Sequence, residues 1–120
     1  MRKTFFILIL GLTILIQGCK KESAPEQFRQ TIDVALKVNQ VYELDLGSYG
    51  REEGADISKQ AKHFVTSTAT RTGSNMTYKY IPAANYVGTD EVELKSEKGS
   101  NGAHLNPNIS FINIKFTISN

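Results

Sequence analysis

The sequence predicts an all-β protein, an antiparallel β-sandwich of about six to seven strands. Short runs of alternating apolar and polar residues recur along the chain, and clusters of Gly, Asn, Asp and Pro separate them. No stretch after residue 30 keeps the apolar period of a helix. The chain of 120 residues suffices for one domain, which we place at residues 31–120.

The N-terminus has the pattern of a secretory signal. Arg2 and Lys3 precede an apolar run from Phe5 to Ile16. This run is shorter than the roughly 20 apolar residues of a membrane-spanning helix, but it fits the apolar region of a signal peptide. The sequence IQGC, which ends at Cys19, resembles the lipobox of bacterial lipoproteins.

The lipobox resemblance implies a lipoprotein signal peptide at residues 1–18, followed by a lipidated Cys19 and a polar tether over residues 19–30. Acylation of Cys19, for instance with palmitate, would anchor the protein in a membrane. Lys20 resembles signals that direct lipoproteins onward, so we expect the outer rather than the inner membrane of a bacterial cell envelope. An uncleaved membrane anchor is the alternative, which the short apolar run disfavours.

The charge balance argues against a nucleic-acid-binding protein, and the cysteine content excludes an internal disulfide. The chain has 14 Lys and Arg against 12 Asp and Glu. Removal of Arg2 and Lys3 with the signal peptide leaves twelve against twelve, so the mature chain is formally neutral and lacks the basic surface of a nucleic-acid-binding protein. Cys19 is the only cysteine, so the domain has no internal disulfide.

The first two strands follow the tether. Residues 20–30 are polar and show no apolar period, which is typical of a linker. Residues 31–38 (TIDVALKV) and 41–46 (VYELDL) then alternate as half-buried strands do. Three glycines and clustered charges predict a loop over residues 47–56.

The second half of the chain supplies the remaining strands and one more long loop, at residues 97–108. Alternation is clear in MTYKYI, TDEVELKS and ISFINIKFTIS and weaker in the two preceding segments. Phe111 is out of step with its apolar neighbours, so we expect a β-bulge there. Strands are therefore expected at residues 57–60, 63–70, 76–81, 89–96 and 109–119.

A structural corner is predicted between the fifth and sixth strands. Pro82 lacks a backbone donor and would end a strand. Tyr86 would fold back on the preceding backbone as a tyrosine corner. Gly88 would permit a tight backbone, and Asp90 would accept backbone N–H bonds in the turn.

The stretch over residues 78–94 (YKYIPAANYVGTDEVEL) resembles the C-terminal half of bacterial immunoglobulin-like and cadherin-like repeats of cell-surface proteins. The resemblance implies an immunoglobulin-like sandwich, and the domain has the usual size of one. Calcium is not expected, because the chain has no dense run of oxygen ligands and does not continue into another repeat after SEKGSNG. The matching positions are Tyr78, Tyr80, Pro82, Tyr86, Gly88, Thr89 and Asp90.

No residue pattern indicates catalysis, a metal or a cofactor. His63 and His104 have no neighbouring nucleophile or metal-ligand pattern. The adjacent pair Glu52 and Glu53 lies in a glycine-rich loop and does not provide two facing carboxylates. We therefore expect no enzyme.

The sequence favours a lipid-anchored, non-catalytic binding or adhesion module. The alternatives are a periplasm-facing accessory or inhibitor lipoprotein, or a small carbohydrate-binding module, for which the absence of Trp is unfavourable. In an immunoglobulin-like topology the N-terminus lies beside the loops after the second and sixth strands. Loops carry adaptable contacts, so the candidate contacts for a membrane-proximal protein partner are Tyr49, Arg51, His104 and Leu105, with purely solvated loops as the alternative.

Overall fold

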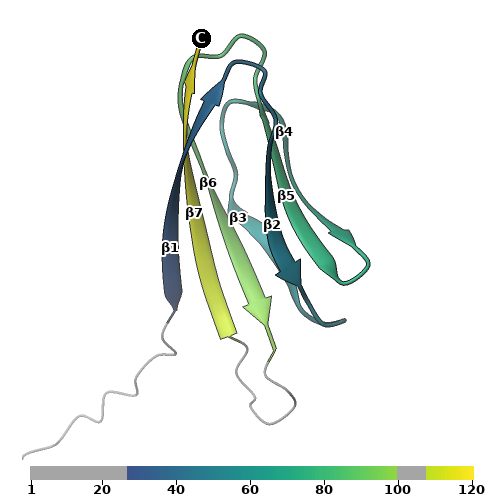
Figure 1. Cartoon of the computed structure of the whole chain (residues 1–120). Helices are drawn as coiled ribbons and strands as arrows, with labels where there is room; N and C mark the ends of the chain where they lie inside the picture. Colours follow the sequence, from purple (N-terminus) through teal and green to yellow (C-terminus); the bar gives the residue numbers. More distant parts are fainter. Residues whose placement is uncertain (1–26, 100–107) are drawn as a thin grey trace, which may run out of the picture.

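A computed structural model describes residues 27–99 and 108–120 of the chain. They form seven strands in two sheets, as the sequence predicts, and Figure 1 shows the two layers facing each other. Residues 1–26, with Cys19, and the candidate contacts His104 and Leu105 lie outside the described residues. The strands are β1 (Phe28–Lys37), β2 (Tyr42–Ser48), β3 (Gly54–Lys59), β4 (Phe64–Thr72), β5 (Asn75–Pro82), β6 (Gly88–Lys98) and β7 (Asn108–Ser119).

One sheet has the order β1-β7-β6-β3 and the other the order β2-β5-β4. All pairs are antiparallel except β1 and β7, which run parallel. The prediction of a β-sandwich is confirmed, with this one parallel pair as a difference. Both β1 and β7 run from the end of the domain where the N-terminus enters toward the opposite end (Figure 1), which makes their pairing parallel.

Two strands begin earlier than the sequence suggests. β1 starts at Phe28, inside the predicted tether, because Phe28 already pairs with Ser110. β3 starts at Gly54, inside the predicted loop, because Gly54 pairs with Glu97 of β6. Pairing with a distant strand therefore orders residues whose own composition indicates loop or linker.

The predicted bulge at Phe111 is wrong. The β6–β7 register runs without a shift from Gly88 opposite Ile118 to Lys98 opposite Asn108. Phe111 points to the outer face in regular alternation, where the guanidinium of Arg29 lies 4.3 Å from its ring centroid. A cation over an aromatic face makes an outward-facing Phe favourable.

The core fills the space between the sheets. Tyr80 of β5 stacks on Phe116 of β7 with ring centroids 4.0 Å apart, and Tyr42 meets the same ring edge-on at 5.5 Å. Each fully buried apolar side chain contributes about 1.5–3 kcal/mol to folding, so these contacts hold the domain without a disulfide. The largest fully buried side chains among the described residues are Tyr78, Tyr80, Pro82, Val92, Leu94, Ile114, Phe116 and Ile118.

The sandwich has two ends, which we name by their connections. The loop end contains residues 49–53 and 73–74, the end of β6, and the starts of β7 and β1. The registers of β3 with β6, of β6 with β7 and of β1 with β7 bring the strand termini together. The distal end contains residues 38–41, 60–63 and 83–87. The start of β1 therefore lies at the same end of the domain as the turn after β2 and the end of β6 (Figure 1). Most of the loop predicted after the sixth strand lies outside the described residues. None of the described residues forms a helix that is long and apolar enough to cross a membrane.

Candidate functional site

The loop end presents a tight turn between β2 and β3. Glu53 N donates to Gly50 O over 3.2 Å, and Gly50 N donates to Glu53 Oε2 over 2.7 Å. These two bonds close the turn from both sides. Arg51 and Glu52 are the central residues of this turn, and both are exposed. The backbone therefore displays one cation and one carboxylate side by side.

Neighbouring strands hold the turn in place. Tyr49 N donates to Ser74 O over 2.8 Å, and the Tyr49 hydroxyl lies 2.8 Å from Ser96 Oγ on β6. The Lys98 ammonium lies 4.7 Å from the Tyr49 ring centroid. Arg71 of β4 donates to Gly50 O over 3.3 Å and also to Glu53 O.

The structure places two of the predicted contact residues, Arg51 and Tyr49, in different environments. Arg51 lies at the exposed tip, as expected of a contact residue. Tyr49 is only 5% exposed, so its ring cannot offer a contact surface and it supports the turn from below. Sequence reasoning missed this role because the partner, Ser96, lies 47 residues away. A lone aromatic among glycines and charges was the available signal, since large aromatics are usually buried.

The distal end is organised around a buried carboxylate. Asp90 Oδ1 accepts from Lys62 N and Glu91 N, each over 2.9 Å. Oδ2 accepts from His63 N and from the Tyr80 hydroxyl, each over 2.8 Å. Burial raises the pKa of Asp90, but these four hydrogen bonds outweigh burial and hold its pKa below the ordinary value. Asp90 thus accepts backbone N–H bonds, as expected, and joins the β3–β4 connection to β6.

The tyrosine of this corner differs from the expectation. The Tyr86 hydroxyl donates to Thr89 O over 2.7 Å, three residues ahead, instead of reaching back to the preceding corner. Its ring stacks on His63 at 4.2 Å. Gly88 has a φ of 145°, and a Cβ there would lie 2.9 Å from the Tyr86 hydroxyl oxygen, so Gly is required.

Tyr80 is the tyrosine that joins distant segments. Its hydroxyl lies 2.9 Å from His63 O in addition to its bond with Asp90. Burial, followed by these interactions with Asp90, raises the pKa of Tyr80 far above the ordinary value, so the phenol stays protonated. Pro82 is buried at the end of β5 opposite Phe64, where it ends the strand as predicted.

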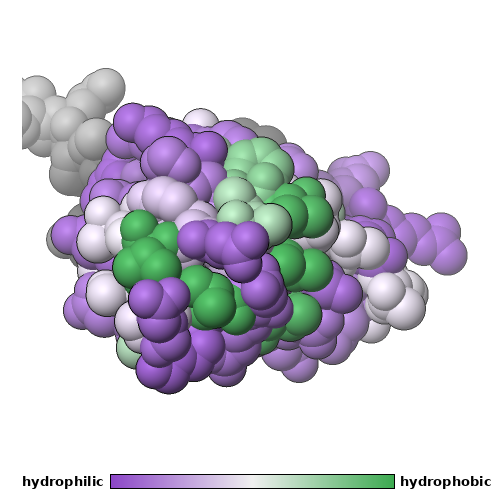
Figure 2. Space-filling view, turned by 90° about the horizontal axis from the view of Figure 1, so that it is seen from above, coloured by the Kyte–Doolittle hydropathy of each residue, from purple (hydrophilic) through white to green (hydrophobic). Residues whose placement is uncertain are grey.

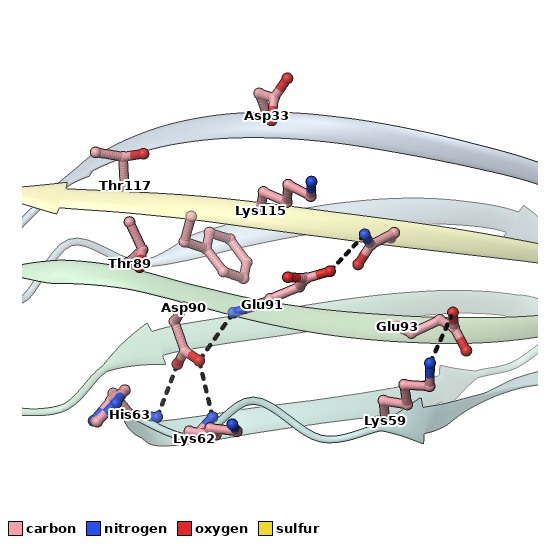
Figure 3. A pocket seen from close by; sticks show the side chains of 12 residues that line it. Asp33, Lys59, Lys62, His63, Thr89, Asp90, Glu91, Glu93, Lys115 and Thr117 are labelled. Carbon is pink, nitrogen blue, oxygen red and sulfur yellow. Dashed lines mark hydrogen bonds and ion pairs between the residues drawn. The ribbon is translucent and has the colours of Figure 1, made fainter.

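An open groove of about 740 Å³ crosses the outer face of the β1-β7-β6-β3 sheet (Figure 3). One ion pair among its lining residues joins Lys59 and Glu93. Glu93 accepts from Ser58 Oγ over 2.7 Å and from Arg29 over 3.1 Å, with Lys59 at 4.0 Å. The hydrogen bond from Ser58 and the two cations hold the pKa of Glu93 below its ordinary value despite burial. The groove therefore has the character of a solvated, mixed-charge sheet face.

The groove offers no recognisable catalytic arrangement. His63 lies at its rim with its ring stacked on Tyr86, and Asp90 beside it is saturated by hydrogen bonds (Figure 3). Within residues 27–99 and 108–120, no three His, Cys, Asp or Glu side chains gather as metal ligands would. The braced turn at the loop end is therefore the better candidate site.

Comparisons with known proteins support the fold. No family model matches the chain, and no curated protein sequence is significantly similar to it. PbICP-C, solved in complex with falcipain-2, has a TM-score of 0.50 and 10% identity, covering 80% of this chain and 93% of that chain. At this identity the likeness shows a shared β-sandwich fold.

Two further solved structures match this chain over nearly all of their own length, but with lower TM-scores. The cysteine protease inhibitor EhICP2 from Entamoeba histolytica has 13% identity and a TM-score of 0.40, covering 76% of this chain and 99% of that chain. Amebosin has 12% identity and a TM-score of 0.40, covering 78% and 99%. PbICP-C is not a cadherin-like repeat, the class that the sequence resembled.

Proposed function

We propose that this protein is a lipid-anchored protease inhibitor located in the bacterial cell envelope, and that its loop end binds a cysteine protease. The braced turn over residues 50–53 carries this proposal. Hydrogen bonds from three separate parts of the sandwich fix the turn, and its two central side chains project from the domain.

A fixed turn suits inhibition for two physical reasons. A loop that is already ordered loses little conformational entropy on binding, which raises affinity for a given contact area. A turn closed by the Gly50–Glu53 bonds also resists being drawn into an extended conformation, because extension would break both bonds. Arg51 supplies the side-chain type most often found at binding hot spots, beside the carboxylate of Glu52.

The shared fold with PbICP-C adds support, since that protein was solved bound to falcipain-2. A domain of this architecture therefore suits docking on another protein. Adhesion was the leading expectation from the sequence, but none of the comparisons favours it over inhibition. Carbohydrate binding loses its one candidate platform, because Tyr49 is buried.

The proposed anchor places the site near a membrane. Acylated Cys19 would be joined to Phe28 by a tether that reaches about 30 Å when fully extended. Since β1 begins at the loop end, the turn would face a membrane-proximal protease. The outer membrane is the proposed location, on the basis of Lys20.

Inhibition can be tested with residues 19–120 carrying Cys19→Ser, because the core of the described residues lies within the strands from Phe28 to Ser119. Inhibition constants would be measured against a panel of purified cysteine proteases, with a serine protease for comparison. Combined Arg51→Ala and Glu52→Ala should weaken inhibition by about tenfold or more, as expected for loss of a hot spot.

The matched control removes another exposed cation and carboxylate. Lys79 and Glu43 form an ion pair of 3.7 Å on the outer face of the β2-β5-β4 sheet. Replacing both by Ala should leave inhibition unchanged. If no cysteine protease in the panel is inhibited, or if both double variants inhibit equally, the proposed site is wrong.

The anchor has its own test. Cys19→Ala should leave the precursor unprocessed or release the protein from the membrane, measured by fractionation and by the mass of the purified chain. Cys19 precedes the first strand, β1, by nine residues in the sequence, so we expect folding of the domain to be unaffected. A variant that is processed and retained as the parent is would contradict lipidation.

A further inference from the structure

Strand β4 forms an open edge of the β2-β5-β4 sheet (Figure 1). The strand that precedes it, β3, belongs to the opposite sheet, where it pairs with β6. An open cleft of about 390 Å³ lies beside Ala69 of β4 and is lined from β3 by Ala55 and Asp56, so β3 does not seal this edge. The backbone of β4 therefore pairs with another strand on one side only.

The turn into β5 shows which backbone groups of β4 face outward. Gly73 and Ser74 connect Thr72 to Asn75 as a two-residue hairpin, with Gly73 at a φ of 62°. In such a hairpin the flanking pair is hydrogen-bonded, and the backbone groups of successive residues point to opposite sides of the strand. The residues whose backbone N–H and C=O groups point away from β5 are therefore Ser67, Ala69 and Arg71.

A side-chain hydrogen bond agrees with this orientation. Gln60 Nε2, in the β3–β4 connection, donates to Ser67 O over 3.2 Å, so this carbonyl does not face β5. A carbonyl oxygen has two lone pairs, and Ser67 O can therefore accept one further hydrogen bond from outside.

The edge of β4 lacks the features that usually keep a strand from pairing with another molecule. Proteins protect edge strands with charged side chains, especially Lys, or with Pro. From Phe64 to Thr70, β4 has no charged residue and no Pro, and Arg71 is engaged with the loop-end turn through Gly50 O. The other edge strands all carry charged residues, which are Arg29, Asp33 and Lys37 in β1, Glu43 and Asp45 in β2, and Asp56 and Lys59 in β3.

A β-bulge limits the regular part of this edge. Phe64 and Val65 belong to the distal end, where Figure 2 shows hydrophobic residues grouped on the surface. The register of β4 with β5 shifts between Phe64 and Thr66, and a bulge interrupts pairing. From Thr66 to Thr72 the register is unbroken, so this segment is the part of the edge that can accept a further strand.

We propose that β4 pairs with β4 of a second copy of this chain, antiparallel and centred on Ala69. This register sets the outward backbone groups of Ser67 opposite those of Arg71, and it joins the two three-stranded sheets into one. Thr68 of one copy then lies opposite Thr70 of the other on the exposed face, and such Thr–Thr pairs favour strand pairing.

The match of this segment to itself is the argument for a second copy. Arg71 is the only charged residue between Thr66 and Thr72, and it lies opposite Ser67 instead of its own counterpart. No like charges therefore meet across the new pair. The same operation on β2, centred on Leu44, would oppose Glu43 with Asp45, which is unfavourable.

Self-association can be measured by sedimentation of residues 19–120 carrying Cys19→Ser. We expect a dimer that forms with rising concentration below about 1 mM, because a single strand pair is a small interface. Amide hydrogen exchange followed by NMR reports the register. Exchange at Ser67, Ala69 and Arg71 should slow as the dimer forms, whereas Thr68 and Thr70, whose backbone groups face β5, should be protected at every concentration.

Charged variants test the contact directly. Thr68→Lys combined with Thr70→Lys would oppose like charges across the pair and should weaken dimerisation by about tenfold or more. The matched control is Thr31→Lys combined with Ala35→Lys, which adds the same charge at exposed positions of β1, an edge of the other sheet, and should change nothing.

A charge exchange separates loss of contact from damage to the fold. Thr68→Glu combined with Thr70→Glu should also weaken dimerisation by itself. Mixing this variant with the Lys variant of the same positions should restore dimerisation, because opposite charges then face each other.

Three outcomes would overturn the proposal. A parent protein that stays monomeric up to about 1 mM would leave this edge to a strand of another protein. Equal weakening by both Lys variants would assign the association to net charge or to another surface. A mixture of the Lys and Glu variants that does not associate would exclude this register. Protease inhibition by the loop end is measured separately, so either proposal can fail alone.

Discussion

The two ends of the sandwich are held together in different ways. At the loop end, the Gly50–Glu53 turn is fixed by several separate bonds, from Tyr49, Arg71 and Ser74. At the distal end, one carboxylate, Asp90, receives four hydrogen bonds and joins the β3–β4 connection to the core. The exposed, charged tip thus rests on several separate bonds, whereas at the distal end one buried group makes four bonds.

This difference predicts unequal sensitivity to mutation. Removing any one bond at the loop end leaves the others in place. Removing Asp90 leaves several donors without an acceptor at once, and an unsatisfied buried donor is costlier than an average hydrogen bond. Substitutions can therefore show whether stability follows the number of bonds that each group makes.

The largest effect is expected from Asp90→Ala. It leaves the N–H groups of Lys62 and His63 without their acceptor, and the Tyr80 hydroxyl keeps only His63 O. We expect a loss of about 3–5 kcal/mol in the free energy of unfolding, since each unsatisfied buried donor costs about 1–3 kcal/mol. Urea unfolding measures this loss. Asp33→Ala, an exposed aspartate of the same sheet, should change stability little, and equal losses for both variants would contradict the central role of Asp90.

Acid should act on the same group. The pKa of Asp90 is lower in the folded protein than in the unfolded chain, because its hydrogen bonds outweigh the opposing effect of burial. Such a group stabilises the fold above its unfolded-state pKa, and this contribution is lost as the pH falls through the folded value. Glu93 acts in the same direction, through Ser58 and its neighbouring cations.

Unfolding free energies between about pH 5 and pH 2 measure this dependence. Stability of the parent protein should fall with falling pH across this range. Asp90→Asn should be less stable than the parent at neutral pH and should show a shallower dependence on pH, because residue 90 then no longer titrates. Parallel curves for the two proteins would show that Asp90 does not contribute.

A smaller effect is expected at the loop end from Tyr49→Phe. The variant loses the bond between the hydroxyl and Ser96 but keeps the ring under Lys98. One buried neutral hydrogen bond is worth about 1 kcal/mol, and the remaining bonds should hold the turn. Tyr42→Phe, which keeps its edge contact with Phe116, is the control. A loss as large as that of Asp90→Ala would show that the loop end also depends on one group.

Much of the fold could be predicted from sequence because alternation reports directly which face of a strand is buried. Ile114, Phe116 and Ile118 alternate in the sequence and are all buried in the structure. The same rule failed at Phe111. A Phe on the outer face suggests a break in register, but here the guanidinium of Arg29 covers the Phe111 ring. Composition also could not show that Gly54 pairs with Glu97, since pairing depends on residues far along the chain.

The candidate site was predicted less well for the same reason. Arg51 could be expected at an exposed tip, because charged residues among glycines are seldom buried. The inward position of Tyr49 depends on Ser96, and the bracing of the turn depends on Arg71. Neither relation leaves a local pattern. Asp90 was correctly expected to accept backbone N–H bonds, but its donors Lys62 and His63 come from another connection.

The smallest effect is expected from Tyr86→Phe, and it separates two views of the distal end. If Tyr86 formed a tyrosine corner, its hydroxyl would join distant segments and its loss would cost stability clearly. In the structure it bonds to Thr89 within the same turn, at an exposed position. We expect a loss of about 0.5 kcal/mol, the low end for a hydrogen bond, because water can replace the bond and stacking on His63 persists. Tyr80→Phe, which loses a bond to the carboxylate of Asp90, should cost about 1.5–3 kcal/mol. Urea unfolding measures the stability loss of both variants. A larger loss for Tyr86→Phe than for Tyr80→Phe would show that Tyr86 forms the tyrosine corner.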